Sequence, residues 1–350
     1  MTRRDHARLK DAGVHEVPRN TALVAASDAS VYMKALAWYQ CDGEDDDVQI
    51  QAAIDAIPSS GGAVSLSEGT FTLGARVQIA NDDIAIRGQG MSTIITIEDD
   101  FPLSQDAIRF LGASRVELAM VQLVGNRTGQ SALVADNGQN GVTFDTCNDY
   151  SLRDVYAKDW AKDAWQIATS GGSGNSTQGR IYNVTADNCR RNGASISASD
   201  SDQVRDVDII ACSFINTTGI APQSGFDIEP NQNTNVITDV RFIGCHFQDN
   251  AKTGCLVDNG AGATVERIQV IGGSSYSNDD YGVQFNAVNE GLILGVGSKD
   301  NTTASRMGIY LKSCNDSIVS ACISEGDTQC IRVDGGARNK VVGCSAKGPT

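Results

Sequence analysis

The segment from residue 225 to residue 312 repeats one phrase four times: Gly225-Phe-Asp-Ile-Glu, Gly254-Cys-Leu-Val-Asp, Gly282-Val-Gln-Phe-Asn and Gly308-Ile-Tyr-Leu-Lys. Each phrase is a glycine followed by alternating inward and outward positions, and this period of two is typical of a β-strand with one buried face. The phrases recur every 26 to 29 residues, and no helical periodicity lies between them. The segment therefore predicts a stack of similar coils rather than alternating helices and strands.

The same phrase recurs in looser form through most of the chain, at spacings of 22 to 34 residues, beginning at Ala107, Gly141, Ala164, Gly193 and Cys330. A second alternating phrase, such as Val240-Arg-Phe-Ile-Gly-Cys, lies between the copies, and turns rich in Asn and Asp separate the two. Two or three strands per repeat predict an all-β fold, a parallel β-helix in which equivalent residues stack about 4.8 Å apart.

This register makes two predictions about small residues. Five glycines should stack at one corner, where a small residue permits a tight turn or a positive φ: Gly193, Gly225, Gly254, Gly282 and Gly308. Four cysteines take comparable places in the second phrase and should form a partial ladder of inward thiols: Cys212, Cys245, Cys322 and Cys344. The ten cysteines include no C-x-x-C pair, so we expect free, mostly buried thiols that carry no chemistry.

The first hundred residues differ from the repeats. Residues 45–58 predict a short amphipathic helix with Val48, Ile50, Ile54 and Ile57 largely on one side, and strands follow it. Such a helix suits the open end of a solenoid, where apolar surface and unpaired strand edges need a cover. We expect residues 1–35 to form an N-terminal arm or extension and residues 36–350 to form a single parallel β-helix domain.

Composition excludes several classes of function. The 350 residues carry a formal net charge of −15, which argues against sequence-independent nucleic-acid binding and against docking on anionic membranes. No run of about 18 apolar residues is present, so no membrane insertion is expected. The basic residues near Met1 are not followed by an apolar run, so no secretory leader is visible; use outside the cell or on a virion stays open. The chain ends soon after a predicted strand, and this favours a fragment of a longer protein or an end covered by a partner, as in a homotrimer.

Three N-terminal motifs resemble the signature of the pectate-lyase-like superfamily of right-handed parallel β-helix proteins: Cys41-Asp-Gly-Glu-Asp-Asp-Asp-Val-Gln-Ile-Gln-Ala-Ala-Ile-Asp-Ala, Gly61-Gly-Ala-Val-Ser-Leu-Ser-Glu-Gly-Thr-Phe and Ile86-Arg-Gly-Gln-Gly. The resemblance covers about residues 38–350 and implies the fold. It leaves function open, because members include polysaccharide lyases, hydrolases, epimerases and bacteriophage tail spikes. It implies a polysaccharide as the partner.

Acidic residues concentrate at one place on the predicted outward face. Asp227 and Glu229 are two apart on one strand, so they share a face about 6.6 Å apart at Cα, and Asp258 should lie one coil along from Glu229. Glycoside hydrolysis uses two carboxylates at about this separation, one as acid and one as base or nucleophile. Crowding of like charges should also raise the pKa of these acids. We therefore predict that Asp227 and Glu229 are catalytic and that Asp258 assists.

The segment Ser224-Gly-Phe-Asp-Ile-Glu-Pro-Asn-Gln resembles the Tyr-Gly-Phe-Asp-Pro-His-Glu active-site segment of mannuronan C5-epimerases. Gly225, Phe226 and Asp227 match it. The catalytic Tyr of that family falls on Ser224 and its His on Glu229, so both proton-transfer groups are missing and epimerase activity is disfavoured.

Other outward residues of the repeated phrase are candidates for binding a glycan: Gln166, Ser195, Gln284, Asn286, Tyr310, Lys312 and Arg332. Trp160, in a predicted turn, is the preferred aromatic residue for stacking on a sugar, whereas Trp165 should pack in the core. No cofactor is expected, and the weak alternative is Ca²⁺ held by Asp227, Glu229 and Asp258. A Ca²⁺-assisted uronate lyase, with Lys312 or Arg332 as base or charge neutraliser, and a non-catalytic binding or shaft protein stay open beside the hydrolase.

Overall fold

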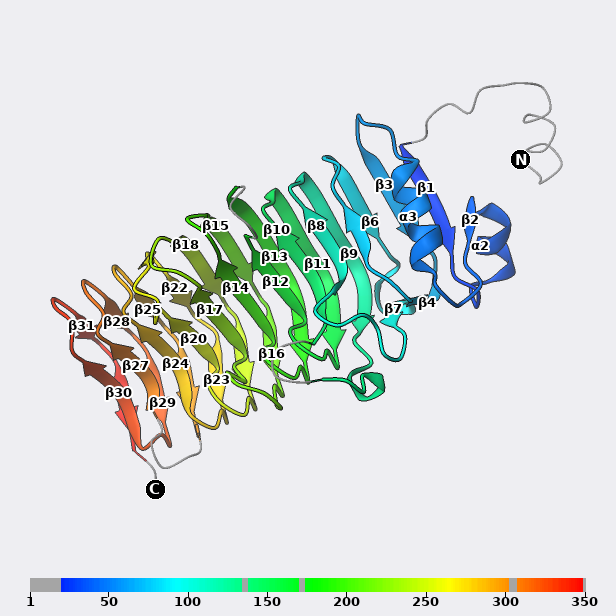
Figure 1. The fold of residues 1–350 in the computed structure, drawn as a ribbon. Helices are drawn as coiled ribbons and strands as arrows, with labels where there is room; N and C mark the ends of the chain where they lie inside the picture. Colours follow the sequence, from blue (N-terminus) through cyan, green and yellow to red (C-terminus); the bar gives the residue numbers. More distant parts are fainter. Residues whose placement is uncertain (1–19, 134–137, 170–173, 302–306, 349–350) are drawn as a thin grey trace, which may run out of the picture.

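The protein is a solenoid of parallel strands that runs from an N-terminal helical cap to an opposite C-terminal end (Figure 1). The computed structural model describes residues 20–133, 138–169, 174–301 and 307–348. Strands make up most of its regular structure, and every registered pair of strands is parallel. Its winding is that of a right-handed parallel β-helix: the repeated phrase predicts the parallel β-helix, and the resemblance of the N-terminal motifs implies the right-handed winding.

The first phrase forms a ten-stranded sheet, called here the site sheet, in which successive coils add one strand each. Its strands are β5 (Val77–Ile79), β8 (Asp106–Leu111), β10 (Asn140–Asp145), β12 (Trp165–Ala168), β14 (Ala194–Ala198), β17 (Phe226–Pro230), β20 (Cys255–Asp258), β24 (Tyr281–Asn286), β27 (Met307–Lys312) and β30 (Gln329–Asp334). Each strand pairs with its counterpart in the coil before and the coil after, in order along the chain.

The remaining strands form a second, 22-stranded sheet that wraps the other sides of the solenoid. Its N-terminal strands are β1 (Thr21–Ala25), β2 (Tyr39–Gln40), β3 (Gly62–Leu66), β4 (Gly69–Leu73), β6 (Ile84–Arg87), β7 (Thr93–Ile97), β9 (Ser114–Val124), β11 (Asn148–Lys158) and β13 (Ser176–Asp187). They are followed by β15 (Gln203–Ile210), β16 (Ser213–Ile215), β18 (Val236–Ile243), β19 (His246–Gln248), β21 (Thr264–Glu266), β22 (Gln269–Ile271), β23 (Ser274–Tyr276), β25 (Leu292–Leu294), β26 (Gly297–Lys299), β28 (Ile318–Ser320), β29 (Ile323–Glu325), β31 (Lys340–Val342) and β32 (Ser345–Lys347).

Two α-helices lie at the N-terminal end, α2 (Val31–Leu36) and α3 (Asp47–Asp55), and two 3-10 turns occur at Gly90–Ser92 and Arg127–Gly129. Helix α3 packs on β1 and β5 and caps the solenoid with Ile50 and Ile54 (Figure 1). The expected amphipathic pattern is wrong at Val48, which is 59% exposed. Neither described helix is long and apolar enough to cross a membrane.

The sheet begins earlier than the boundary expected at residue 36. Strand β1 (Thr21–Ala25) pairs in parallel with β3 and with β2, and Val24 and Ala25 are fully buried. Part of the segment interpreted as an arm is therefore an integral strand of the solenoid, while the rest of that interpretation falls on residues 1–19, outside the described residues. The strand forms because Ala22 and Val24 face the core while Thr21 and Leu23 between them are more exposed.

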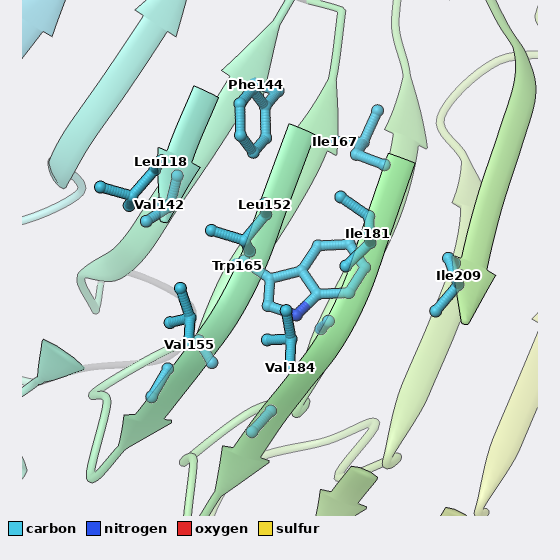
Figure 2. Packing of buried hydrophobic residues seen from close by; sticks show 14 of the residues in the cluster. Leu118, Val142, Phe144, Leu152, Val155, Trp165, Ile167, Ile181, Val184 and Ile209 are labelled. Atoms are coloured by element: carbon cyan, nitrogen blue, oxygen red, sulfur yellow. The ribbon is translucent and has the colours of Figure 1, made fainter. Parts of the chain in front are cut away.

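Inward residues of successive coils fill the interior. Trp165 points inward from β12, and the labelled aliphatic residues of neighbouring strands surround it (Figure 2). Aromatic side chains continue the core along the axis: the Phe214 and Phe247 rings stack with centroids 5.4 Å apart, and the Phe226 ring meets the Phe214 ring edge to face at 5.1 Å. The core placement expected for Trp165 is confirmed.

The five predicted glycines do stack at one corner. The backbone N–H groups of Ala194 and Phe226 donate to the carbonyl oxygens of Gly225 and Gly254 in the next coil. A Cβ built on Gly254 would lie 2.5 Å from the carbonyl oxygen of Gly282, and the other four positions are equally crowded. None of the five has positive φ, so the close approach of consecutive coils, and not a left-handed turn, requires glycine here.

A ladder of buried amides stacks beside the glycines at the same corner and ends on a carboxylate. The Asn250 side-chain amide donates to the Oδ1 of Asn278 (2.8 Å), Asn278 donates to Asn301 (3.1 Å), and Asn301 donates to Asp327 (2.9 Å). Each oxygen also accepts the backbone N–H of the preceding rung. Buried polar groups are thereby paired in every one of these coils.

Cysteines occupy the predicted inward positions at a second corner, between the two strands that each coil gives to the 22-stranded sheet. Cys212, Cys245 and Cys322 are fully buried, and the Cys245 thiol donates to the Ile209 carbonyl of the preceding coil. Burial raises the pKa of the Cys322 thiol, and that of Cys147 to about 12, which disfavours the reactive thiolate at both positions. Cys344, the last of the predicted ladder, is only partly buried.

We expect Gly254→Ala to destabilise the fold by about 1–3 kcal/mol, because the new methyl group forces apart two hydrogen-bonded coils. Urea denaturation monitored by circular dichroism would measure the loss. Gly260→Ala is the matched control, since a Cβ there meets only Asp258 at an ordinary 3.7 Å. Equal stability of the two variants would contradict the proposed role of the stack.

We also expect a thiol reagent to label only Cys330 and Cys344 rapidly in the native protein, because the other eight cysteines are buried. Mass spectrometry of the labelled peptides, with urea-unfolded protein as the fully reactive reference, would identify the modified positions. Rapid labelling of Cys212 or Cys245 would contradict the inward ladder.

Candidate functional site

Strand β17 positions two of the three predicted catalytic acids. Phe226 and Ile228 point into the core, so Asp227 and Glu229 between and after them project from the outward face. Ile228 pairs with Val257 of β20, which places Glu229 beside Asp258 in the next coil. The alternating phrase and the coil register together bring the three carboxylates to one place, as predicted.

These acids line a pocket of about 310 Å³ on the outer face of the site sheet. Its walls are Arg191, Ala221, Pro222, Asp227, Glu229, Leu256 and Asp258. The loop that precedes β17 supplies Ala221 and Pro222, and the turn before β14 supplies Arg191, the one basic residue among the described lining residues. The pocket thus combines three carboxyl groups, one guanidinium and a small apolar wall.

Asp227 differs from its neighbours in burial. Only 1% of its surface is exposed, whereas 48% of the Glu229 side chain is exposed. Its Oδ2 accepts a long 3.5 Å hydrogen bond from Asn192, and its Oδ1 has no hydrogen-bond partner among the described residues. Burial, and then the charge of Glu229, raise the pKa of Asp227 well above its ordinary value, so the protonated form is favoured.

Two residues that the sequence analysis missed complete the site. Arg191 forms an ion pair with Glu229, Nη2 to Oε2 at 2.8 Å, and its Nη1 lies 3.6 Å from an oxygen of Asp163. Asp163 is fully buried, and desolvation raises its pKa despite the nearby Arg191. Asp163 and Arg191 lie in the turns just before β12 and β14, and the residue types in these turns vary from coil to coil. The only sequence feature that could have indicated them is a charged residue in a turn that otherwise holds small and polar residues.

The structure corrects the prediction for two of the sugar-binding candidates. Trp160 is completely buried and cannot stack on a sugar, because its ring packs where Gly125 and Gly141 leave room for it. Ser195 lies on the expected outward face of β14 but is buried, and its hydroxyl donates to Asp163 at 2.7 Å. Gln166 is half-buried and bridges Asn140 and Ser197.

The remaining candidates lie on the C-terminal side of the pocket. Asn286 donates to the Oδ1 of Asp258 at 2.6 Å, and Gln284 is half-buried on the same strand, β24. Tyr310 on β27 lies between the ring of Tyr281, at 5.5 Å, and the guanidinium of Arg332, also at 5.5 Å. Lys312 is exposed on β27, and Arg332 pairs with Asp334. Tyr310 is buried, with 7% of its surface exposed, and none of these residues lines the pocket itself.

The acids do not form a recognisable metal site. Among the described residues, no group of three or more His, Cys, Asp or Glu side chains is arranged to hold a metal ion. Two of the pocket acids are engaged by Arg191 and Asn286, which compete for the carboxylate oxygens that Ca²⁺ would need. The donor set therefore gives no support to the Ca²⁺ alternative.

No protein-family model and no curated protein matches the sequence. The fold, however, is shared with solved structures. The A-module of mannuronan C-5 epimerase AlgE4 from Azotobacter vinelandii superposes with a TM-score of 0.63 at 17% identity, over 87% of this chain and 92% of that one. The Dettilon tailspike protein gives 0.60 at 11% identity, over 98% and 73%.

A third structure, endo-xylogalacturonan hydrolase from Aspergillus tubingensis, gives a TM-score of 0.53 at 12% identity, over 87% of this chain and 90% of that one. All three are parallel β-helix proteins. The chain therefore has the right-handed parallel β-helix fold that these structures share. At these identities the likeness concerns the fold.

We expect Asp227→Asn to stabilise the protein more at pH 7 than at pH 4. The pKa of Asp227 is raised on folding above its unfolded value of about 3.9, so the folded state holds the proton over a pH range in which the unfolded state has lost it. Stability of the parent consequently falls as pH rises through that range, by about 1.4 kcal/mol per unit of pKa shift. Asparagine does not ionise and escapes this loss.

Urea denaturation of the parent and the variant at both pH values would measure the difference. Asp334→Asn, an exposed acid on the last site-sheet strand at the place that corresponds to Glu229, is the control and should leave the pH dependence unchanged. A pH-independent difference between Asp227→Asn and the parent would show that Asp227 ionises normally.

Proposed function

We propose that the protein binds a polysaccharide along the site sheet and hydrolyses it in the pocket formed by Asp227, Glu229 and Asp258. The observation that carries this proposal is the contrast between two acids on one strand. Asp227 is buried, its pKa is raised, and its Oδ1 has no hydrogen-bond partner among the described residues, whereas Glu229 is exposed and ionically paired. When two carboxyl groups of one site lie in environments that differ in this way, their pKa values differ, so one can serve as the acid and the other as the base.

In this mechanism Asp227 is the general acid and donates its proton to the glycosidic oxygen as the bond to the anomeric carbon breaks. Glu229 acts on the opposite side, either as the base for a water molecule or as a nucleophile, depending on the separation of the carboxyl groups in the complex. Asp258, fixed by Asn286, adds negative charge that favours the oxocarbenium-like transition state. Leu256 and Pro222 offer apolar surface to a sugar ring.

Polysaccharide binding or processing is also the coarser inference from the structural neighbours, whose names describe an epimerase, a tailspike and a glycan hydrolase. The epimerase chemistry is not proposed, because Ser224 and Glu229 stand where that family has its Tyr and His. The uronate-lyase alternative is weaker than hydrolysis, since Lys312 lies two strands from Asp258 on the site sheet, about 10 Å away.

A second candidate is a binding protein without catalysis. Arg191 forms an ion pair with the Glu229 carboxylate at 2.8 Å. If this ion pair persists when the glycan binds, Glu229 would be a weak base. The extended, partly aromatic face of β24, β27 and β30 would then hold a glycan without cleaving it.

We expect Asp227→Asn and Glu229→Gln each to lower cleavage by about 10²–10⁴-fold, because each removes a proton-transfer group without removing the binding face. The assay is a glycan panel read by reducing ends and, in parallel, by absorbance at 235 nm from unsaturated ends. Parent activity should extend to higher pH than an ordinary aspartic acid would permit and should fall as pH rises through the raised pKa of Asp227.

Glu325→Gln, an exposed acid on β29 in the other sheet, is the control and should retain parent activity. Binding without new reducing ends would favour the non-catalytic protein, and unsaturated ends would favour the lyase. Full activity of Asp227→Asn would exclude the hydrolytic site as assigned.

A further inference from the structure

Arg191 is shared by a pocket acid and a buried acid that cannot reach the ligand. Its two terminal nitrogens point to different carboxylates, Nη2 to Glu229 at 2.8 Å and Nη1 to Asp163 at 3.6 Å. Asp163 has no exposed surface, so it cannot contact a glycan. We propose that Asp163 is a positioning residue, which holds Arg191 against Glu229 and so keeps Asp227 and Glu229 in their separate roles; this inference rests on the proposed hydrolytic site.

The carboxylate of Asp163 is itself fixed in place. Its Oδ1 accepts the backbone N–H of Asn192 at 2.9 Å, and its Oδ2 accepts the hydroxyl of Ser195 at 2.7 Å. These donors belong to the next coil, immediately around Arg191 in sequence. Asp163 therefore holds both the guanidinium of Arg191 and the backbone segment that carries Arg191. The orientation of the Asp163 carboxylate is set by two hydrogen bonds that involve neither Asp227 nor Glu229.

Several charges act on Asp227 together. Glu229 lies on the same strand, Asp258 lies on β20, and Asp163 and Arg191 lie in the turns before β12 and β14. Of these groups only Arg191 is positive. Removing the negative charge of Asp163 favours ionisation of Asp227, whereas removing the positive charge of Arg191 opposes it.

Two variants should consequently shift the Asp227 titration in opposite directions. Asp163→Asn should lower the midpoint by about one pH unit, and Arg191→Gln should raise it by a similar amount. The measurement is a pH titration of ¹³C-carboxyl-labelled Asp in the full chain by NMR, with the Asp227 signal assigned by its loss in Asp227→Asn. Loss of packing alone would move both variants in the same direction, toward the ordinary value.

Asp327→Asn provides a matched control at the far end of the site sheet. Asp327 is equally buried, and it also accepts a backbone N–H, from Asn301, and hydroxyl groups, from Ser324 at 2.6 Å and Ser298 at 3.1 Å, besides the side-chain amide of Asn301. No guanidinium is recorded among its hydrogen-bond or ion-pair partners in the described structure. Its substitution should cost stability as Asp163→Asn does while leaving the Asp227 midpoint unchanged.

If Asp163→Asn does not fold, Ser195→Ala, which removes one of the two bonds that fix Asp163, should produce a smaller shift of the Asp227 midpoint, and Arg191→Gln still tests the opposite sign. With a substrate in hand, Asp163→Asn should move the high-pH limit of cleavage downward and lower kcat with KM unchanged. Unaltered Asp227 midpoints, or shifts of the same sign in Asp163→Asn and Arg191→Gln, would overturn the positioning role. A parent that cleaves no glycan would refute the hydrolase, while the titrations, which need no substrate, would still decide whether Asp163 controls Asp227.

Discussion

Parallel hydrogen bonding between successive coils is the constraint on which the rest of the structure depends. Each residue of one coil is held opposite its counterpart in the next, so a side chain's position along the axis follows from its place in the repeat. This register explains why Glu229 and Asp258, 29 residues apart, lie side by side. It also explains the crowding at Gly254, because the coils cannot separate there without breaking the bonds that define them.

The repeated phrase alone could predict the features that obey this register. Alternation identified Asp227 as outward and Phe226 as inward, and spacing put Asp258 beside Glu229. The turns between phrases obey no such rule, since their lengths differ and their side chains can point either way. Trp160 was accordingly misplaced, because nothing in its own turn shows that two distant glycines make room for its ring. Asp163 and Arg191 were missed for the same reason.

The electrostatics of the pocket also differ from a simple cluster of like charges. Crowding does contribute, but burial is the larger cause of the raised pKa of Asp227, and burial follows from side chains outside the repeated phrase. Glu229 and Asp258, at equivalent places of adjacent strands, are more exposed than Asp227 and have closer partners, Arg191 at 2.8 Å and Asn286 at 2.6 Å. One strand can therefore present two carboxyl groups that differ in burial and in partners. The loop and the turn that precede the strand do not contact the two positions in the same way.

The amide ladder from Asn250 to Asp327 has a polarity with consequences for chemical ageing. Each asparagine of the ladder donates its NH₂ group to the side-chain oxygen of the next residue toward the C-terminal end. The final residue only accepts, so an aspartate can take that place. Deamidation of Asn278 would replace its donating nitrogen with an oxygen facing the oxygen of Asn301, and two acceptors would then meet in a buried corner. At the last position the sequence already has an aspartate, Asp327, whose carboxylate only accepts hydrogen bonds from the ladder. Tolerance to this common form of protein damage is thus set by a rung's place in the ladder rather than by its burial, which is equal along its length.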